Sequence, residues 1–174
     1  MEIEAKYKCD NLEEFSQKVL DKGFVLEKSK HQIDTYFIVN RKNDDGTRDY
    51  LRIRGDPEGN NFSLDFHKVL SLLETDETET KFNDMKGMVK ILSALGFEVV
   101  CVLNKDRKKY KKDSLIVVLD KVEGLGDFVE VEFVGESTDE NKDLVLKTAS
   151  ELGLKEKNRV IKKGYPDLLI ESLK

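Results

Sequence analysis

The sequence predicts an α+β fold, a closed antiparallel β-barrel of about eight strands with helices packed on its outside. Three observations predict it: a strand, helix and glycine unit occurs three times, the remaining segments have strand composition and end in turn signals, and charged residues alternate with apolar ones. Strands joined by tight turns form antiparallel sheets, and so many strands in 174 residues must curl or close.

The repeated unit fixes three helices. Its extended segments begin at Glu2-Ile3-Glu4, Glu77-Thr78-Glu79 and Glu130-Val131-Glu132. The helices that follow are predicted over about Asn11 to Lys22, Asp84 to Leu95 and Asp139 to Leu152, with N-cap candidates Asp10, Asn83 or Asp84, and Thr138 or Asp139, and with Gly23, Gly96 and Gly153 at their ends. Helical spacing of Leu12, Phe15, Val19 and Leu20, and of Met88, Ile91, Leu92 and Leu95, gives each of the first two helices one face to bury on a sheet.

The segments between these helices are predicted to be strands, because they are rich in β-branched and aromatic residues. They are Val25 to Val39, Asp49 to Gly55, Asn61 to Val69, Phe97 to Tyr110, Ser114 to Val122 and Phe128 to Gly135. Turn signals separate several of them: Asn-Asp-Asp-Gly from Asn43, Asp-Pro-Glu-Gly from Asp56 and Glu-Gly-Leu-Gly from Glu123.

Length and composition predict a single domain over residues 1–174. The chain is 39% hydrophobic and 37% charged, too apolar for disorder. No apolar run approaches the roughly 20 residues that span a bilayer, so we expect a cytoplasmic protein without a membrane partner. A formal charge of −5 argues against nucleic acid as a partner, and the lysine-rich run Lys108 to Lys112 is interpreted as a solvated hairpin tip.

The alternation along the strands predicts a charged interior. Side chains two residues apart share a face, so Glu2, Glu4 and Lys6 lie opposite Ile3, Ala5 and Tyr7. The same parity groups Arg52 with Arg54, Lys105 with Arg107 and Glu130 with Glu132. If the helices cover the apolar face, the charged face lines the barrel lumen; the alternative for any single strand is a polar face turned to solvent.

The charges themselves indicate the ligand. Carboxylate pairs held two residues apart repel each other unless cations lie between them, and oxygen-only ligands suit Mg²⁺ or Mn²⁺. Guanidinium groups match phosphate oxygens. A site that offers both is what a metal-bound polyphosphate needs.

Several segments resemble one family. Glu2-Ile3-Glu4-Ala5-Lys6 is similar to the N-terminal ExExK signature of the CYTH superfamily, the triphosphate tunnel metalloenzymes. Supporting segments follow in the family's order and span nearly the whole chain: Asp34 to Phe37, Leu51 to Arg54, Glu77 with Glu79, Leu95 to Phe97, Lys105 with Arg107 and Tyr110, and Leu119 to Glu132. Leu119 to Glu132 and Leu95 to Phe97 are similar to the class IV adenylyl cyclase branch, as is the ending from Lys163 to Leu169.

The resemblance implies roles for named residues. Glu2, Glu4, Glu130 and Glu132 would hold metal, with Asp120 as a further candidate. Lys6, Arg52, Arg54, Lys105 and Arg107 would contact the triphosphate, with His67 as an additional donor. Of these, Glu2, Glu4, Lys6 and Arg107 are expected to act in catalysis.

The chain also departs from the family pattern. Alternation with Phe62, Leu64 and Phe66 turns Asp65 and His67 inward and leaves Lys68 outside, where the family places an inward lysine. Thr75 stands where a basic residue is common, and Gly164 where a serine is expected. Glu77 and Glu79 would pair with lumen cations or hold a second metal, and His31 is interpreted as a surface residue.

The resemblance implies an enzyme that converts ATP to cyclic AMP and pyrophosphate with Mg²⁺ or Mn²⁺. Two alternatives stay open: a triphosphatase acting on thiamine triphosphate, inorganic triphosphate or a nucleoside triphosphate, and a noncatalytic polyphosphate-binding module. Strand edges near the barrel mouth would permit a homodimer.

Overall fold

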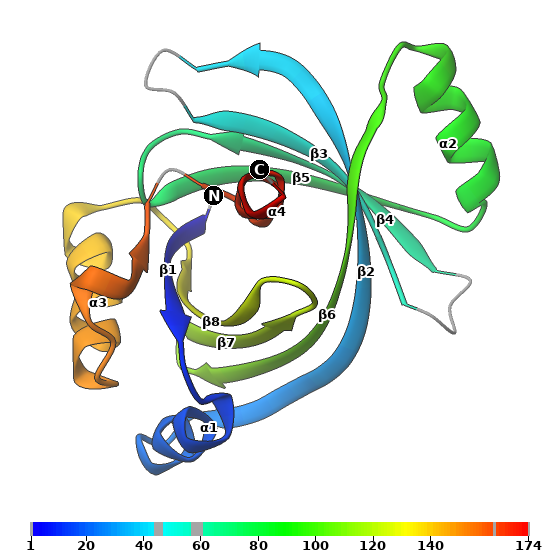
Figure 1. Cartoon of the computed structure of the whole chain (residues 1–174). Coiled ribbons are helices and arrows are strands. Elements are labelled where there is room, and N and C mark those ends of the chain that lie inside the picture. Colours follow the sequence, from blue (N-terminus) through cyan, green and yellow to red (C-terminus); the bar gives the residue numbers. More distant parts are fainter. Residues whose placement is uncertain (1, 44–46, 57–60, 162, 174) are drawn as a thin grey trace.

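Eight strands close into a barrel in the computed structural model of the chain, which describes residues 2–43, 47–56, 61–161 and 163–173 (Figure 1). The strands are β1 (Glu2–Cys9), β2 (Val25–Lys42), β3 (Arg48–Gly55), β4 (Phe62–Val69), β5 (Glu74–Phe82), β6 (Val99–Lys112), β7 (Leu115–Val122) and β8 (Gly126–Val134). They pair antiparallel in the order β5-β4-β3-β2-β6-β7-β8-β1, and β1 pairs with β5 to close the ring. The predicted closed antiparallel barrel is confirmed.

The closure between β1 and β5 is short. Only Glu2 and Ile3 pair with β5, and further along the same edge Lys6 and Tyr7 pair with a two-residue strand, β9 (Arg159–Val160). A short 3₁₀ helix, η1 (Glu156–Asn158), precedes β9, and the sequence predicted neither element. The end of the β4–β5 turn and β9 therefore both lie beside β1.

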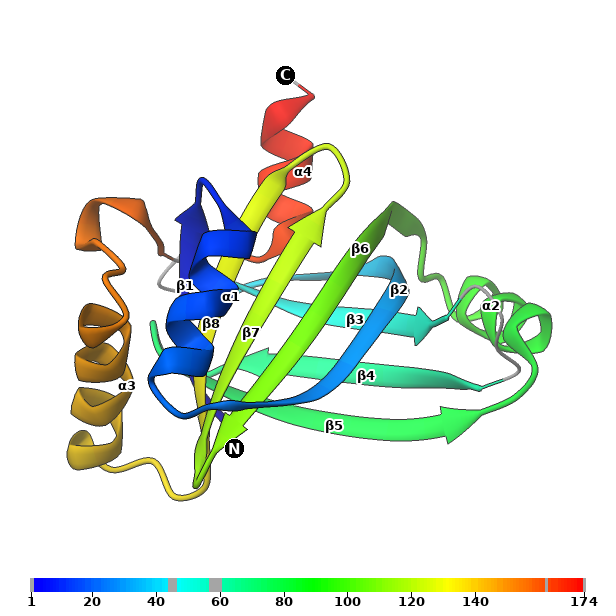
Figure 2. The same cartoon turned by 90° about the horizontal axis from the view of Figure 1, so that it is seen from below.

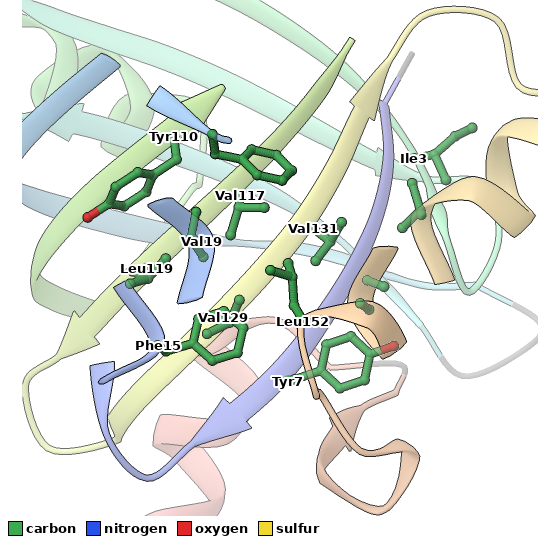
Figure 3. Packing of buried hydrophobic residues seen from close by; sticks show 14 residues of the cluster. Ile3, Tyr7, Phe15, Val19, Tyr110, Val117, Leu119, Val129, Val131 and Leu152 are labelled. Carbon is green, nitrogen blue, oxygen red and sulfur yellow. The ribbon is translucent and has the colours of Figure 1, made fainter. Parts of the chain in front are cut away.

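Three helices cover the outer face of the barrel, as predicted. The helices α1 (Leu12–Asp21) and α3 (Asp139–Glu151) pack on β1, β7 and β8 (Figures 1 and 3). The helix α2 (Met85–Ala94) packs on β2, β3 and β4 (Figure 1). Ile3, Ala5 and Tyr7 are buried beneath α1 and α3, which confirms the predicted parity of β1.

The helix ends follow the predicted chemistry with one correction. Asp84 and Thr138 cap α2 and α3, but Asn11 caps α1 and Asp10 does not, because the Asn11 side chain accepts hydrogen bonds from the backbone of Glu13 and Glu14. Gly23, Gly96 and Gly153 take φ values of 84°, 87° and 87°, the left-handed conformation that ends each helix.

The buried stripe of α2 is narrower than predicted. Leu92 is 5% exposed and packs on the barrel with Met85, Met88 and Val89, whereas Ile91 and Leu95 are 57% and 69% exposed. The positions at i, i+3, i+4 and i+7 face the sheet, and Ile91 and Leu95 lie outside this set. On α1, Leu20 is likewise 42% exposed beside the buried Val19.

This packing predicts a stability difference between adjacent residues. Leu92→Ala should lower the free energy of unfolding by about 2–5 kcal/mol, because it leaves a cavity between α2 and the sheet. Ile91→Ala, the matched control on the exposed side, should change it by less than about 0.5 kcal/mol. Urea denaturation followed by circular dichroism measures both, and equal losses for the two variants would contradict the observed orientation of α2.

A fourth helix, α4 (Tyr165–Ser172), was not predicted, and it stands in one mouth of the barrel beside the β7–β8 turn (Figures 1 and 2). Its residues Tyr165, Leu168 and Leu169 pack with Tyr36, Leu103, Val122 and Phe128 of the barrel wall. Phe128 shares its strand face with Glu130 and Leu103 shares its face with Lys105, so part of the lumen is apolar and filled by α4.

The remaining expectations concern turns and surface. The turn predicted at Glu123 to Gly126 joins β7 to β8, but those at Asn43 and Asp56 involve residues 44–46 and 57–60, which lie outside the described residues. Lys108, Lys111 and Lys112 are exposed on the β6–β7 hairpin, as expected. Within the described part of the chain, every helix is too short or too polar to cross a bilayer.

Candidate functional site

A cavity of about 290 Å³ occupies the lumen. Ten of the predicted site residues line it: Glu2, Glu4, Lys6, Arg52, Arg54, His67, Lys105, Arg107, Glu130 and Glu132. They come from β1, β3, β4, β6 and β8, and the antiparallel register brings their charged faces together. The alternative of a solvent-facing polar sheet is therefore excluded for these strands.

Three carboxylates gather on one wall. Glu4 lies opposite Glu132 in the β1–β8 ladder, and Glu130 lies two residue pairs further along, on the same face, opposite Lys6. One ligand oxygen from each of Glu4, Glu130 and Glu132 lies within 4.8 Å of the others. We call these three residues the acidic group.

Two carboxylates of the acidic group, Glu130 and Glu132, have pKa values shifted in opposite directions. Lys6 Nζ lies 3.2 Å from Glu4 and 3.0 Å from Glu130. Burial opposes the ionisation of Glu130, but the charges of Lys6 and Arg107 hold the pKa of Glu130 well below its usual range. Burial, and then the charges of Glu2 and Glu130, raise the pKa of Glu132 well above its usual range.

Glu2 adds another carboxylate to the wall that carries the acidic group. Burial and the carboxylates of Glu77 and Glu4 raise its pKa to about 7. Adjacent buried carboxylates with raised pKa values mark a place where positive charge is lacking. The donor set is all oxygen, so the residues present fit a divalent cation of the Mg²⁺ or Mn²⁺ type.

The opposite wall carries cations that are held from behind. Arg52 donates to one oxygen of Asp65, from Nε at 3.0 Å and from Nη2 at 2.8 Å. Arg54 donates to both oxygens of Asp34, from Nε at 2.8 Å and from Nη2 at 2.9 Å. Lys105 Nζ lies 3.0 Å from Asp34. Burial opposes ionisation of Asp34, but Lys105 and Arg54 keep its pKa well below the usual range. These carboxylates fix the cations in position before any ligand binds.

Lys105 is nonetheless the most desolvated of these cations. Burial and the neighbouring charge of Arg107 lower its pKa to about 8. An anion in the lumen would oppose both effects, because added negative charge favours the ammonium form of this lysine.

Arg107 joins the two walls. Its guanidinium donates to Asp120 from Nε at 2.7 Å and to Glu130 from Nη2 at 2.7 Å. Asp120 is fully buried and lies outside the acidic group; it accepts a second hydrogen bond from Arg107, from Nη2, and a third from the Tyr165 hydroxyl at 2.8 Å. Both of its oxygens thus have partners, and its role as a metal ligand stays a prediction.

His67 and Glu77 face each other across β4 and β5. Their side chains meet at 2.7 Å between His67 Nδ1 and Glu77 Oε1. Lys68 is exposed and Thr75 lines the cavity, so the parity predicted for this part of the chain is confirmed. Glu77 and Glu79 are both exposed, but only Glu77 of the two lines the cavity, so the expected place of Glu79 among the lumen charges is wrong.

Tyr165 was missed by the sequence analysis although it lies at the centre of the site. The Lys6 and Lys105 ammonium groups lie 4.3 and 5.3 Å from the centroid of its ring, and its hydroxyl reaches Asp120. The signal was present: Pro166 in the first turn and Asp167 at the third position, with apolar residues after them, indicate the start of a helix.

Gly164 places this helix. Its backbone N–H donates to Asp167 at 3.0 Å, and the Tyr50 hydroxyl donates to the same carboxylate. A Cβ at position 164 would lie 2.9 Å from the Tyr50 ring. The serine expected there would collide with Tyr50, which explains why glycine occupies this position.

Fold and site together define a barrel protein whose lumen sets a group of buried carboxylates against a wall of fixed cations. The CYTH domain model matches residues 1–165. The chain therefore belongs to the CYTH family.

Individual relatives agree with this assignment. A Methanocaldococcus jannaschii protein named "Putative adenylate cyclase" is 35% identical over 174 residues, which cover 97% of this chain and 98% of that protein. A solved structure from Pyrococcus horikoshii matches with a TM-score of 0.86 and 29% identity, covering 97% of this chain and 99% of that one. A Hippeastrum protein, whose title reports a dominant triphosphatase activity, shares the fold at 17% identity and a TM-score of 0.59, covering 88% of this chain and 87% of that one.

Proposed function

We propose that the protein binds the triphosphate of ATP in its lumen with Mg²⁺ or Mn²⁺ and converts ATP to cyclic AMP and pyrophosphate. The observation that carries the proposal is the opposition of the acidic group to Arg52, Arg54 and Arg107 within one cavity. A bare polyphosphate would be repelled by the carboxylates, and a bare metal would be repelled by the arginines, but their complex neutralises both walls.

The acidic group, together with Glu2, would hold the metal. Bound there, a divalent cation would neutralise phosphate charge and polarise the bond to the leaving group. Lys6 lies between Glu4 and Glu130 and would present its ammonium group to the same phosphates. Asp120 is assigned a different role, because it holds Arg107 in place from behind.

The cations would orient the phosphate chain. Arg52 and Arg54 are held by Asp65 and Asp34, so their positions need no reorganisation when charge develops on the leaving group. Lys105 and Arg107 would take the remaining phosphate oxygens. The 3′-hydroxyl would attack the α-phosphorus, the bond to the β-phosphate oxygen would break, and pyrophosphate would leave.

The cavity also offers a place for the nucleoside. Its volume of about 290 Å³ lies just below the roughly 300–1,000 Å³ range of ligand pockets, and the phosphates would fill its charged part. Val69, Leu72, Val160 and Pro166 line the same cavity beside the β4–β5 turn and the start of α4, and this apolar rim suits a base.

Hydrolysis is the second candidate. The same site would serve a triphosphatase with water as the nucleophile, and the Hippeastrum protein shows that the fold can carry such an activity. The cyclase is preferred because the resemblance of Leu119 to Glu132 is to the cyclase branch and the M. jannaschii relative bears that name. A binding module is disfavoured, because buried carboxylates weaken anion binding unless metal is recruited.

Product identity decides between these functions. We expect ATP with Mg²⁺ or Mn²⁺ to yield cyclic AMP and pyrophosphate in equal amounts, and a chelator to stop the reaction. Separation of nucleotides by ion-exchange chromatography with a phosphate assay measures this, with inorganic triphosphate and thiamine triphosphate as parallel substrates. Phosphate without cyclic AMP would reject the cyclase in favour of the triphosphatase, and tight binding without turnover would favour the binding module.

A further inference from the structure

A ring nitrogen of His67 is buried in the lumen without a hydrogen-bond partner among the described residues. This nitrogen is Nε2, and His67 lines the cavity. The other ring nitrogen, Nδ1, lies 2.7 Å from Glu77 Oε1. The side chain is 15% exposed, so the ring is held between the barrel wall and the cavity.

The partner of Nδ1 determines what Nε2 can do. An ionised carboxylate only accepts hydrogen bonds, so Nδ1 carries a proton when it meets Glu77. Burial opposes ionisation of Glu77, but the hydrogen bond from His67 and the charges of Arg52 and Arg54 hold the pKa of Glu77 below its usual value. In the neutral ring Nε2 is then the unprotonated nitrogen, with its lone pair available.

The groups around the ring come from three strands. Tyr50 lies opposite His67 on β3 and Glu77 lies opposite it on β5. The charges of Arg52 and Arg54 on β3 act on the Glu77 carboxylate, which in turn acts on Glu2 of β1. Thr75, whose Oγ1 is also buried without a partner, lines the same part of the cavity. Two unpartnered polar atoms in one lumen indicate contact with a polar part of the substrate.

We propose that His67 is the general base of the reaction and that Glu77 is its positioning residue. This inference rests on the proposed function and deepens it by naming the group that removes the proton. Nε2 accepts the proton of the attacking 3′-hydroxyl. At the same time the oxygen of that hydroxyl bonds to the α-phosphorus, and the bond from the α-phosphorus to the leaving phosphate oxygen breaks. The proton then passes from Nε2 to solvent or to the departing phosphate, which returns the ring to its neutral form.

A cationic role would make a different prediction. If His67 only supplied positive charge to phosphate, lysine at this position would replace it. A lysine ammonium has three donors and no acceptor, so it cannot take a proton while it is charged. His67→Lys therefore separates the two roles, and His67→Gln removes both charge and basicity while keeping polarity.

The experiment compares kcat, KM and the pH profile of these variants under the conditions that give wild-type turnover. We expect kcat to fall about 100-fold in both His67→Gln and His67→Lys, the range typical of a lost general base, with KM changed by less than about threefold. The limb of the wild-type profile along which kcat rises with pH should disappear. Added imidazole should restore part of kcat in His67→Ala, and Glu77→Gln should lower kcat less than His67→Gln does.

The chain offers a matched control. His31 is the other of its two histidines and also meets a carboxylate, with Nδ1 2.7 Å from Asp106 Oδ1. It is exposed and lies outside the cavity lining. His31→Gln should keep wild-type kcat and the wild-type pH profile.

Thermal unfolding temperatures close to wild type would show that the variants are folded. Wild-type kcat in His67→Gln, or in His67→Lys, would overturn the general base and leave the proposed function standing. Wild-type protein without turnover of any triphosphate would overturn the proposed function, and the base with it.

Discussion

Replacing Glu132 with glutamine should lower kcat by at least about 1,000-fold, because it removes a carboxylate from the acidic group that would hold the metal. Isothermal titration with Mn²⁺ should show weakened binding in the same variant. Glu136→Gln, two residues beyond β8 and exposed, is the matched control and should behave as wild type in both assays.

The same substitution should not harm folding. Glu132 is 6% exposed and faces the carboxylates of Glu2 and Glu130, so its negative charge is unfavourable in the metal-free protein. We expect the free energy of unfolding of metal-free Glu132→Gln to equal or exceed that of wild type. Retained activity and Mn²⁺ affinity would show that the metal binds outside the acidic group. A large loss of stability would contradict the excess of negative charge described for this wall.

Arg107→Met should lower kcat/KM by about 100- to 1,000-fold and also destabilise the protein. The loss of activity follows from removing a charged group that would contact the phosphates, an effect of about 3–4 kcal/mol. The loss of stability, about 3–5 kcal/mol, follows because Asp120 stays buried without its double hydrogen bond. Steady-state kinetics and urea denaturation measure the two effects separately.

A double variant separates the loss of activity from the loss of stability. Arg107→Met with Asp120→Asn removes both charges of the pair, so stability should return toward wild type while activity stays low. Single Asp120→Asn should keep Mn²⁺ affinity, since Asp120 lies behind Arg107 and outside the acidic group. Recovery of activity in the double variant would contradict a role for Arg107 at the substrate, and loss of Mn²⁺ binding in Asp120→Asn would make Asp120 a ligand.

Strand parity predicted most of the charged residues that share the lumen, with Glu79 as an exception. Glu4, Arg52, Arg107 and Glu132 line one cavity because an inward residue on a closed barrel has nowhere else to point. Parity does not predict what fills the lumen. Phe128 and Glu130 share a face, yet one packs on α4 and the other lies among the charges, since the difference depends on where a distant helix docks.

The sequence also did not predict which ion-pair partner each lumen residue has. A buried aspartate can bind metal or fix an arginine, and only the register of β6 with β7, which sets Arg107 opposite Asp120, shows the second. The pairing of His67 with Glu77 depends in the same way on the β4–β5 register. A lone histidine on a strand carries no such information, so its inward direction could be predicted but its dyad could not.

The central claim is that one cavity binds metal and triphosphate together between its two walls. Anomalous diffraction from crystals grown with Mn²⁺ and tripolyphosphate tests it most directly. We expect manganese between Glu4, Glu130 and Glu132 and the triphosphate against Arg52, Arg54 and Arg107. Manganese or triphosphate bound only on the outer surface of the barrel would contradict it.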